Sequence, residues 1–379
     1  MRSSTRGEVD PFIVMDVMEA ARQREAEGHR VIHMEVGQPG TPAPRAAREA
    51  LAEAMEKDAL GYTVALGLPE LRSGIAELYG DWYDVDLDPG RVVVTAGSSA
   101  AFVLSFTALF DAGARVGVTE PGYPSYRQIL KSLDLNPIGL PTHAESRHVP
   151  QLPDTKLDGL IVASPANPTG TMLSKPDLAA LISQCQEAGT AFISDEIYHG
   201  VQYEGRAISA LEVSDDLYVI NSFSKYFSMT GWRLGWMVVP EDHIRRIERL
   251  AQNMFICAPH AAQVAALGAL QAREETEEML QVYARNRELM MDGLPKAGFN
   301  KIAPPDGAFY IYADVSEYTS DSLAFCREVL NEAGVAITPG LDFDPVRGHQ
   351  TVRFSYARST ADIEEGIARL KPFMDARNT

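Results

Sequence analysis

Apolar residues recur at helical spacing along much of the chain. Residues 12–27 alternate apolar and charged positions and stop at Gly28, a residue type that often ends helices. The same periodicity continues from residue 241 to about residue 297, which predicts one long helical region. It also predicts helices over residues 46–57, 68–83, 99–110, 125–132, 175–189, 322–333 and 360–375.

Short apolar runs lie between these helices and are typical of strands. From residue 92 to residue 239 strands and helices alternate, which argues for a mostly parallel sheet covered by helices on both faces. We therefore expect an α/β fold. The predicted strands span residues 31–34, 92–95, 115–119, 158–163, 191–194, 217–221, 234–239, 309–313, 335–338 and 351–356.

The length of the chain, 379 residues, exceeds what one ordinary core accommodates, so two domains are expected. The pattern changes at Gly298, after the long helical region. We predict a large domain over residues 45–285. Residues 1–44 and 286–379 would form a smaller α+β domain that closes against it.

Composition narrows the class of protein. The chain is 45% hydrophobic and 23% charged with a formal net charge of −18, so nucleic acid and membrane are not expected as partners. We expect no signal peptide, because no apolar core follows the first arginines, and no apolar run reaches the ~18 residues that a membrane span needs. Cys185, Cys257 and Cys326 lack metal-binding spacing, which predicts reduced thiols, a cytoplasmic location and no metal site.

Lys225 lies among hydroxyl and aromatic residues in the segment that runs from Ser222 to Arg233. A lysine in apolar surroundings loses its proton more easily, and a neutral amine can form a Schiff base with an aldehyde. The neighbouring hydroxyls and Arg233 suit a phosphate group. The segment suggests a lysine that holds pyridoxal phosphate, with a solvated lysine in a surface loop as the alternative.

Other chemically distinctive residues follow predicted strands, where ligands of doubly wound sheets bind. A turn rich in small residues precedes Ser98 and Ser99 and opens a helix, whose terminal N–H groups suit a phosphate. Tyr123, Asn167 and Asp195 lie at the ends of later strands. Alone, each is explained by a tight turn, a packed ring or a capped backbone. Together with Lys225 they predict a ring-binding site at one edge of one sheet.

Three motifs occur in a fixed order along the chain. They are Asn-Pro-Thr-Gly at 167–170, Asp-Glu-Ile-Tyr at 195–198 and Ser-Phe-Ser-Lys at 222–225, with Gly-Trp-Arg following at 231–233. This combination resembles the class I pyridoxal-phosphate aminotransferases of fold type I, and the resemblance covers nearly the whole chain. It implies transfer of the α-amino group of an L-amino acid to a 2-oxo acid by ping-pong kinetics.

The resemblance also implies roles for individual residues. Lys225 would form the Schiff base with pyridoxal phosphate and move the substrate proton, and Asp195 would pair with the pyridine nitrogen. Asn167 and Tyr198 would hydrogen-bond the ring 3-oxygen, and Tyr123 would stack on the ring.

Further roles concern the phosphate and the substrate. The phosphate would be held by Ser98, Ser99, Ser222 and Arg233. Tyr62 would reach the phosphate of a neighbouring subunit, which implies a homodimer with shared active sites. The substrate α-carboxylate would be bound by Arg353, with help from Asn167 and the backbone of Gly37.

The sequence leaves the substrate open. The Gly-Gln-Pro-Gly run at 37–40 and Asp344 depart from the common family pattern near the substrate. Arg127, Arg206 and Arg347 are expected in solvent, though each could meet a side-chain carboxylate.

The sequence also leaves part of the chemistry open. A pyridoxal-phosphate-dependent lyase of the same fold, such as a C–S β-lyase or a cyclopropane-forming synthase, is the alternative. A non-enzymatic ligand sensor is a third hypothesis, against which the intact lysine argues.

Overall fold

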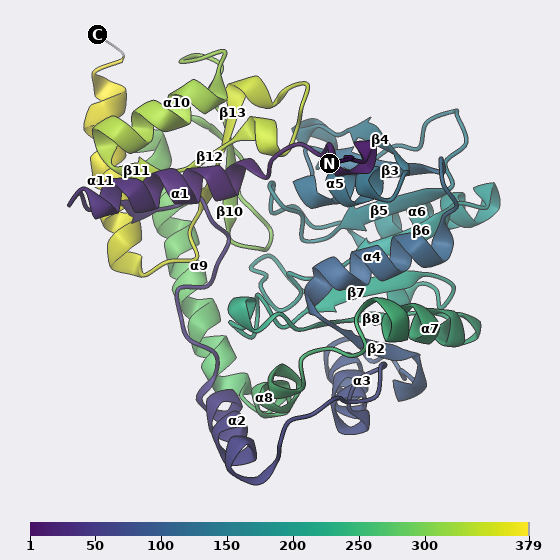
Figure 1. Ribbon diagram of the computed structural model, residues 1–379. Helices are drawn as coiled ribbons and strands as arrows, with labels where there is room; N and C mark the ends of the chain where they lie inside the picture. Colours follow the sequence, from purple (N-terminus) through teal and green to yellow (C-terminus); the bar gives the residue numbers. More distant parts are fainter. Residues whose placement is uncertain (378–379) are drawn as a thin grey trace.

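The computed structural model describes residues 1–377 and arranges them around three sheets (Figure 1). The largest has seven strands in the order β2-β8-β7-β6-β5-β3-β4, and every neighbouring pair is parallel except those that include β8. The mostly parallel sheet is therefore confirmed. Its strands are β2 (Val92–Thr95), β3 (Arg115–Glu120), β4 (Asn136–Pro141), β5 (Gly159–Ala163), β6 (Ala191–Asp195), β7 (Tyr218–Ser222) and β8 (Gly235–Val238).

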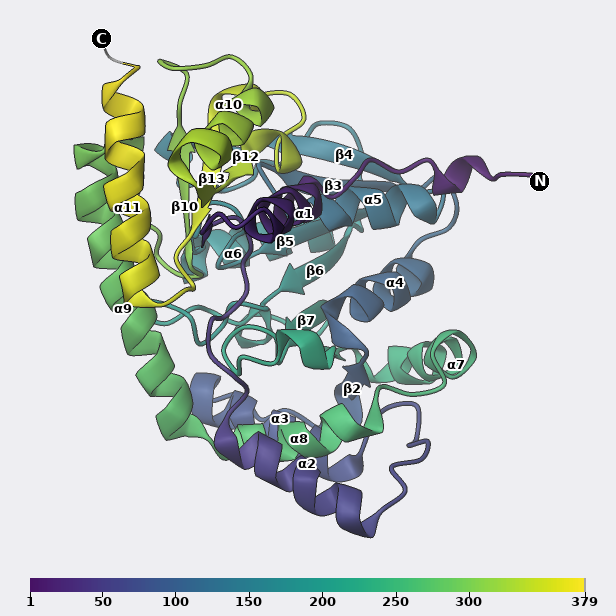
Figure 2. The same cartoon turned by 60° about the vertical axis from the view of Figure 1, so that its left-hand side comes forward.

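Helices cover both faces of this sheet. Successive residues of a strand point to opposite faces, so each strand contributes side chains to two hydrophobic cores. On β5, Leu160 and Val162 enter one hydrophobic core, while Ile161 enters the other. The first core is shared with α3 (Pro69–Tyr83), α6 (Lys175–Ala188) and α8 (His260–Leu270). The second is shared with α4 (Gly97–Leu109), α5 (Pro124–Ser132) and α7 (Ile244–Met254), which lie together in Figure 2.

The strand β4 was not predicted. It lies at the edge of the sheet beside β3, and its sequence contains Pro137 and Pro141. Proline is tolerated in a sheet mainly at an edge, where one side of the strand needs no hydrogen bonds. The edge position explains why β4 tolerates two prolines and why its sequence shows little of the apolar pattern from which strands are predicted.

The prediction of one continuous helical region over residues 241–297 is wrong. The region forms three helices, α7, α8 and α9 (Arg273–Lys296). Pro259 lies in the first break, and proline both lacks an N–H and disfavours helical geometry in the residue before it. Each of the three helices buries one apolar face, so the helical spacing of apolar residues continues on both sides of the breaks.

The remaining strands form a four-stranded sheet, β12-β13-β10-β9, and a parallel pair, β1 with β11. The strand predicted over residues 335–338 is divided between β11 and β12, which belong to different sheets. The helix predicted over residues 322–333 ends at residue 328 and continues as a π-helical turn. These strands are β1 (Ile32–His33), β9 (Lys301–Ile302), β10 (Tyr310–Asp314), β11 (Val335–Ala336), β12 (Thr338–Pro339) and β13 (Thr351–Ser355).

Helices α1 (Ile13–Ala26), α10 (Ser322–Glu328) and α11 (Thr360–Asp375) lie beside these smaller sheets, whereas α2 (Arg45–Lys57) packs on α8. Helix α9 packs on α11 and runs toward α8, so it connects the two parts of the molecule (Figure 2). The predicted domain boundary at residues 285 and 286 falls inside this continuous helix and stays a prediction.

Two further observations concern the surroundings of the protein. Within residues 1–377, no helix combines the length and apolarity that crossing a bilayer requires. Cys185, Cys257 and Cys326 are free thiols. The cytoplasmic location stays a prediction.

Candidate active site

Lys225 follows β7 at the carboxyl edge of the large sheet. Its Nζ donates a hydrogen bond of 2.6 Å to the Gly37 carbonyl and lies 5.6 Å from the centre of the Tyr198 ring. Burial, followed by repulsion from the Arg353 and Arg233 guanidinium groups, lowers the pKa of Lys225 to about 7. A substantial fraction of this amine is therefore uncharged and nucleophilic near neutral pH.

Asp195 ends β6, beside β7 in the sheet, and is buried. Burial raises the pKa of its carboxyl group to about 6, although hydrogen bonds from the Tyr126 hydroxyl and the Ile197 N–H oppose this rise. Tyr126 lies on α5 and is itself buried. Its hydroxyl donates to Asp195 Oδ2, so it both orients the carboxylate and stabilises its charge.

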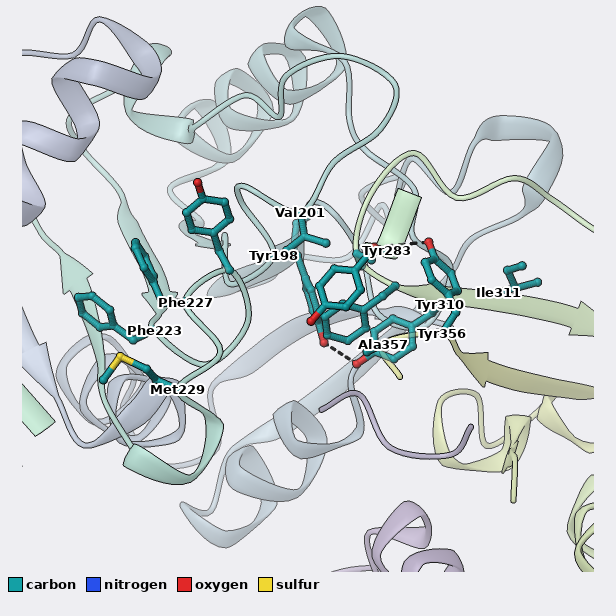
Figure 3. Close-up of a cluster of buried hydrophobic side chains, with 14 of the residues drawn as sticks. Tyr198, Val201, Phe223, Phe227, Met229, Tyr283, Tyr310, Ile311, Tyr356 and Ala357 are labelled. Carbon is teal, nitrogen blue, oxygen red and sulfur yellow. Dashed lines mark hydrogen bonds between the residues drawn. The ribbon is translucent and has the colours of Figure 1, made fainter. Parts of the chain in front are cut away.

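Tyr198 and Tyr310 meet between the two parts of the molecule. Their hydroxyl oxygens are 2.7 Å apart within a cluster of buried aromatic side chains (Figure 3). A Cβ atom on Gly37 would lie 1.6 Å from the Tyr310 hydroxyl oxygen, so only glycine allows this approach. The pair brings β10 to the edge of the large sheet.

Arg353 lies on β13 and is buried between two rings. Its guanidinium carbon is 4.2 Å from the centre of the Tyr310 ring and 4.6 Å from that of Phe343. Nη1 donates to Asn167 Oδ1 over 2.8 Å, and Nη2 donates to the Glu35 carbonyl. The buried Nε has no hydrogen-bond partner among the described residues, so one donor of this guanidinium is unpaired.

Asn167 is set in the turn after β5, and Arg353 determines how its amide lies. Because Oδ1 accepts from Arg353, the amide nitrogen remains able to donate elsewhere. The contact joins the large sheet to β13, which is far from it along the chain.

The proposed phosphate ligands gather around the first turn of α4. Ser98 and Ser99 are its second and third residues, whose N–H groups have no partner within the helix. The Arg233 guanidinium lies so close that a Cβ atom on Gly97 would be 2.4 Å from its Nη2. The Ser222 hydroxyl lies 2.9 Å from Ser224 Oγ and 3.1 Å from the Leu234 carbonyl.

This donor set fits a phosphate dianion, because helix N–H groups and a guanidinium are the groups that bind one. Arg233 and the first turn of α4 together form a phosphate cradle, and a side chain at position 97 larger than that of glycine would collide with the Arg233 guanidinium. A lysine of lowered pKa and a buried carboxylate complete the fit to pyridoxal phosphate.

The structure places two of the predicted site residues, Tyr123 and Tyr62, in very different surroundings. Tyr123 precedes α5 and packs edge-to-face on Tyr126, with ring centres 5.2 Å apart, and on Phe12 at 5.9 Å. Tyr62 is 83% exposed, so this chain alone does not bring it into the site. Its predicted contact with a neighbouring subunit stays a prediction.

Sequence reasoning missed several residues of the site. Tyr126 follows Tyr123, the residue just before α5, by three positions, a spacing that brings the two side chains to the same side of the chain and could have revealed Tyr126. Tyr310, Phe343 and Glu35 carry no such signal, because they meet Arg353 only through tertiary packing.

Comparison with known proteins decides the family. The model of the family described as aminotransferase class I and II matches residues 29–370. The chain belongs to this family. Its members use pyridoxal phosphate, and the enzyme is accordingly a pyridoxal-phosphate-dependent transaminase that transfers an amino group to a 2-oxo acid.

Individual relatives cover the whole length. The valine–pyruvate aminotransferase of Mycobacterium tuberculosis is 45% identical over 99% of both chains. A crystal structure from Silicibacter pomeroyi is 64% identical, with a TM-score of 0.95 and complete coverage of both chains. The aspartate aminotransferase of Thermus thermophilus, crystallised with maleate, has a TM-score of 0.92 and 30% identity over 98% of this chain and 100% of its own. The predicted fold type I is thereby confirmed.

The contact between Tyr126 and Asp195 yields a testable prediction. Replacing Tyr126→Phe removes the hydroxyl that stabilises the charged carboxylate, so the pKa of Asp195 rises further. A hydrogen bond to a charged group contributes ~1.5–3 kcal/mol, so we expect kcat to fall about tenfold or more. Because the predicted role of Asp195, pairing with the pyridine nitrogen, uses the ionised carboxylate, the acidic limb of the pH–rate profile should move to higher pH.

The matched control is Tyr79→Phe, which removes a buried hydroxyl that accepts from Trp236 and does not contact Asp195. It should leave both kcat and the acidic limb unchanged. If Tyr126→Phe behaves like this control, Tyr126 does not stabilise the Asp195 carboxylate.

Proposed function

We propose that this transaminase transfers the amino group of an apolar L-amino acid to a 2-oxo acid, using pyridoxal phosphate attached to Lys225. The observation that carries the proposal is the Lys225 amine, whose pKa is lowered to about 7 beside Arg353, Arg233 and Asp195. An uncharged amine next to a phosphate cradle and a buried carboxylate matches the requirements of this cofactor.

The side chains would divide the work as follows. Bound pyridoxal phosphate supplies an aldehyde and an electron-withdrawing ring, which together weaken the Cα–H bond of an amino acid. Asp195 would keep the pyridine nitrogen protonated, and the amides of α4 with Arg233 would hold the phosphate. Lys225, once released, would take the Cα proton as a general base and return it as an acid.

Arg353 would orient the substrate. The Tyr310 and Phe343 rings and the hydrogen bond to Asn167 hold the guanidinium in one plane, in which it would donate to the α-carboxylate. A fixed carboxylate determines which bond of Cα stands perpendicular to the cofactor ring.

An apolar donor is favoured by the state of the arginines that the sequence left open. Arg127 pairs with Glu120 at 3.2 Å, Arg347 with Asp344 at 2.7 Å, and Arg206 with Glu212 at 2.6 Å. A side-chain carboxylate would have to break one of these pairs. The relative named valine–pyruvate aminotransferase, 45% identical, supports the same choice.

We also propose that two copies form a homodimer. Tyr62 and Val64 are exposed, and a 2.9 Å contact between the Gly61 carbonyl and His260 Nδ1 ties their segment to the start of α8. Met254 and Ile256, just before α8, are exposed as well. Apolar side chains gathered in this way are typical of a surface that a partner covers.

The attachment of the cofactor can be tested on protein from which it has been removed. After pyridoxal phosphate is added and reduced with borohydride, peptide mapping should find the label on Lys225, and Lys225→Ala should remain unlabelled. Because only the uncharged amine reacts, the capture rate should rise as pH increases through about 7 and then level off. A label on another residue, or a rate independent of pH in this range, would contradict the proposal.

The substrate class is tested with a panel of amino donors. Valine and other apolar donors should react with pyruvate by ping-pong kinetics, and aspartate should have kcat/KM at least about tenfold lower, since Arg127, Arg206 and Arg347 already pair with carboxylates. Comparable values for aspartate would reject the preference for an apolar donor.

The same panel separates transamination from a lyase reaction. With an amino acid alone, a transaminase stops after one equivalent per site. Continuous release of pyruvate and ammonia under these conditions would instead indicate the lyase.

The dimer is tested by sedimentation and cofactor titration. The protein should sediment at twice the chain mass, and Tyr62→Phe should remain dimeric while its dissociation constant for pyridoxal phosphate increases about tenfold, because one hydrogen bond to a charged group is lost. A monomer that retains full activity would refute the shared site.

A further inference from the structure

A short extended segment, residues 32–37, links the smaller sheets to the active site. Its first residues belong to β1, and Met34 continues the pairing through a 2.9 Å bond from its N–H to the Ala336 carbonyl. The Met34 carbonyl accepts from the Ser355 N–H at 2.7 Å. The segment is therefore held on both sides before it reaches the site.

Two carbonyl groups of segment 32–37 contact the cationic groups of the site. The Glu35 carbonyl accepts from Arg353 Nη2 and, at 2.8 Å, from Thr338 Oγ1. The Gly37 carbonyl accepts from Lys225 Nζ. A shift of this short segment would consequently displace the contacts of both Lys225 and Arg353.

The side chain of Glu35 is buried and pairs with the half-buried His33, which in turn meets the exposed Glu25. The Glu35 carboxylate is 0% exposed, and Oε1 lies 2.8 Å from His33 Nδ1. The other ring nitrogen of His33 lies 3.1 Å from Glu25 on α1. Glu35 Oε2 is buried and has no hydrogen-bond partner. A buried carboxylate with an unpaired oxygen is costly, so its presence here calls for a role.

The charges of these three side chains are complementary. The Glu35 carboxylate, assisted by Glu25, raises the pKa of His33 despite partial burial. An imidazolium between two carboxylates links α1 to segment 32–37 by charge-assisted hydrogen bonds, which are stronger and more directional than neutral ones.

We propose that Glu35 and His33 are positioning residues for the substrate carboxylate. Their ion pair, which is buried on the Glu35 side, fixes the backbone at residue 35, so that the Glu35 carbonyl holds the Arg353 guanidinium in the orientation that receives the substrate. Neither side chain touches substrate or cofactor. The inference rests on the proposed function of Arg353 and adds residues that hold this arginine in place.

The effect follows from how strictly a carboxylate fork depends on geometry. A guanidinium that is free to tilt loses the bidentate fit, and displacement by about 1 Å can cost up to two orders of magnitude in a positioned interaction. Loss of the ion pair should weaken binding of the carboxylate, whereas the phosphate cradle on α4 should stay intact.

The experiment compares Glu35→Gln, Glu35→Ala and His33→Gln in the cofactor-loaded enzyme. We expect Glu35→Ala to raise KM for the amino donor about tenfold and the two conservative variants to raise it about threefold, with kcat within about twofold of the parent. The dissociation constant of 3-methylbutanoate, a carboxylate without an amino group, should rise by the same factors. The dissociation constant of pyridoxal phosphate should not change.

The control is Glu212→Gln, which removes a carboxylate that pairs with Arg206 and Lys175 and contacts neither Lys225 nor Arg353. It should lower the unfolding temperature without altering KM. If Glu35→Ala does not fold, Glu35→Gln and His33→Gln decide the question by the same criteria.

Two results would overturn the inference. One is a 3-methylbutanoate dissociation constant that stays within about twofold of the parent in both conservative variants. The other is an equal rise in the pyridoxal phosphate dissociation constant, which would indicate general loosening. A parent enzyme that transfers no amino group would instead reject the proposed function itself.

Discussion

The site depends on one amine that burial and two guanidinium groups keep easy to deprotonate. Lys225 lies where β7 ends, near Arg353 and Arg233, and its pKa is lowered to about 7. The parallel sheet brings the other residues of the site close to this amine, because the carboxyl ends of parallel strands lie at a common edge. Asp195, Asn167 and Tyr123 reach the same edge from β6, β5 and β3.

Asp195 and Arg353, two buried charged residues of the site, are each held by neighbouring aromatic side chains. Tyr126 orients Asp195, and the Tyr310 and Phe343 rings enclose Arg353. Glu196, next to Asp195 in sequence, has different partners: it accepts from Ser209 Oγ and from the Ala210 N–H. Burial raises the pKa of Glu196 to about 8, so two adjacent carboxyl groups acquire different properties from their surroundings.

Most elements could be predicted from periodicity, and the failures have physical causes. The region from residue 241 to 297 was predicted as one helix because its three helices each keep an apolar face, whereas the break depends on local geometry near Pro259. Strand β4 was missed because an edge strand with two prolines carries little apolar pattern. The run at residues 335–338 has the apolar pattern of one strand, and the sequence does not reveal that its two ends pair with different sheets.

The sequence by itself determined the chemistry of the site, because the order and spacing of the motifs around Asn167, Asp195 and Lys225 are local properties of the chain. Only the tertiary structure decided which other side chains and carbonyl groups hold the charged residues of the site in place. Tyr126 meets Asp195 and Glu35 meets Arg353 across long stretches of chain, and such contacts depend on how the sheets pack. The pairing of Arg127 and Arg347 with carboxylates was likewise decided by folding, since a charge in isolation does not reveal which partner will neutralise it.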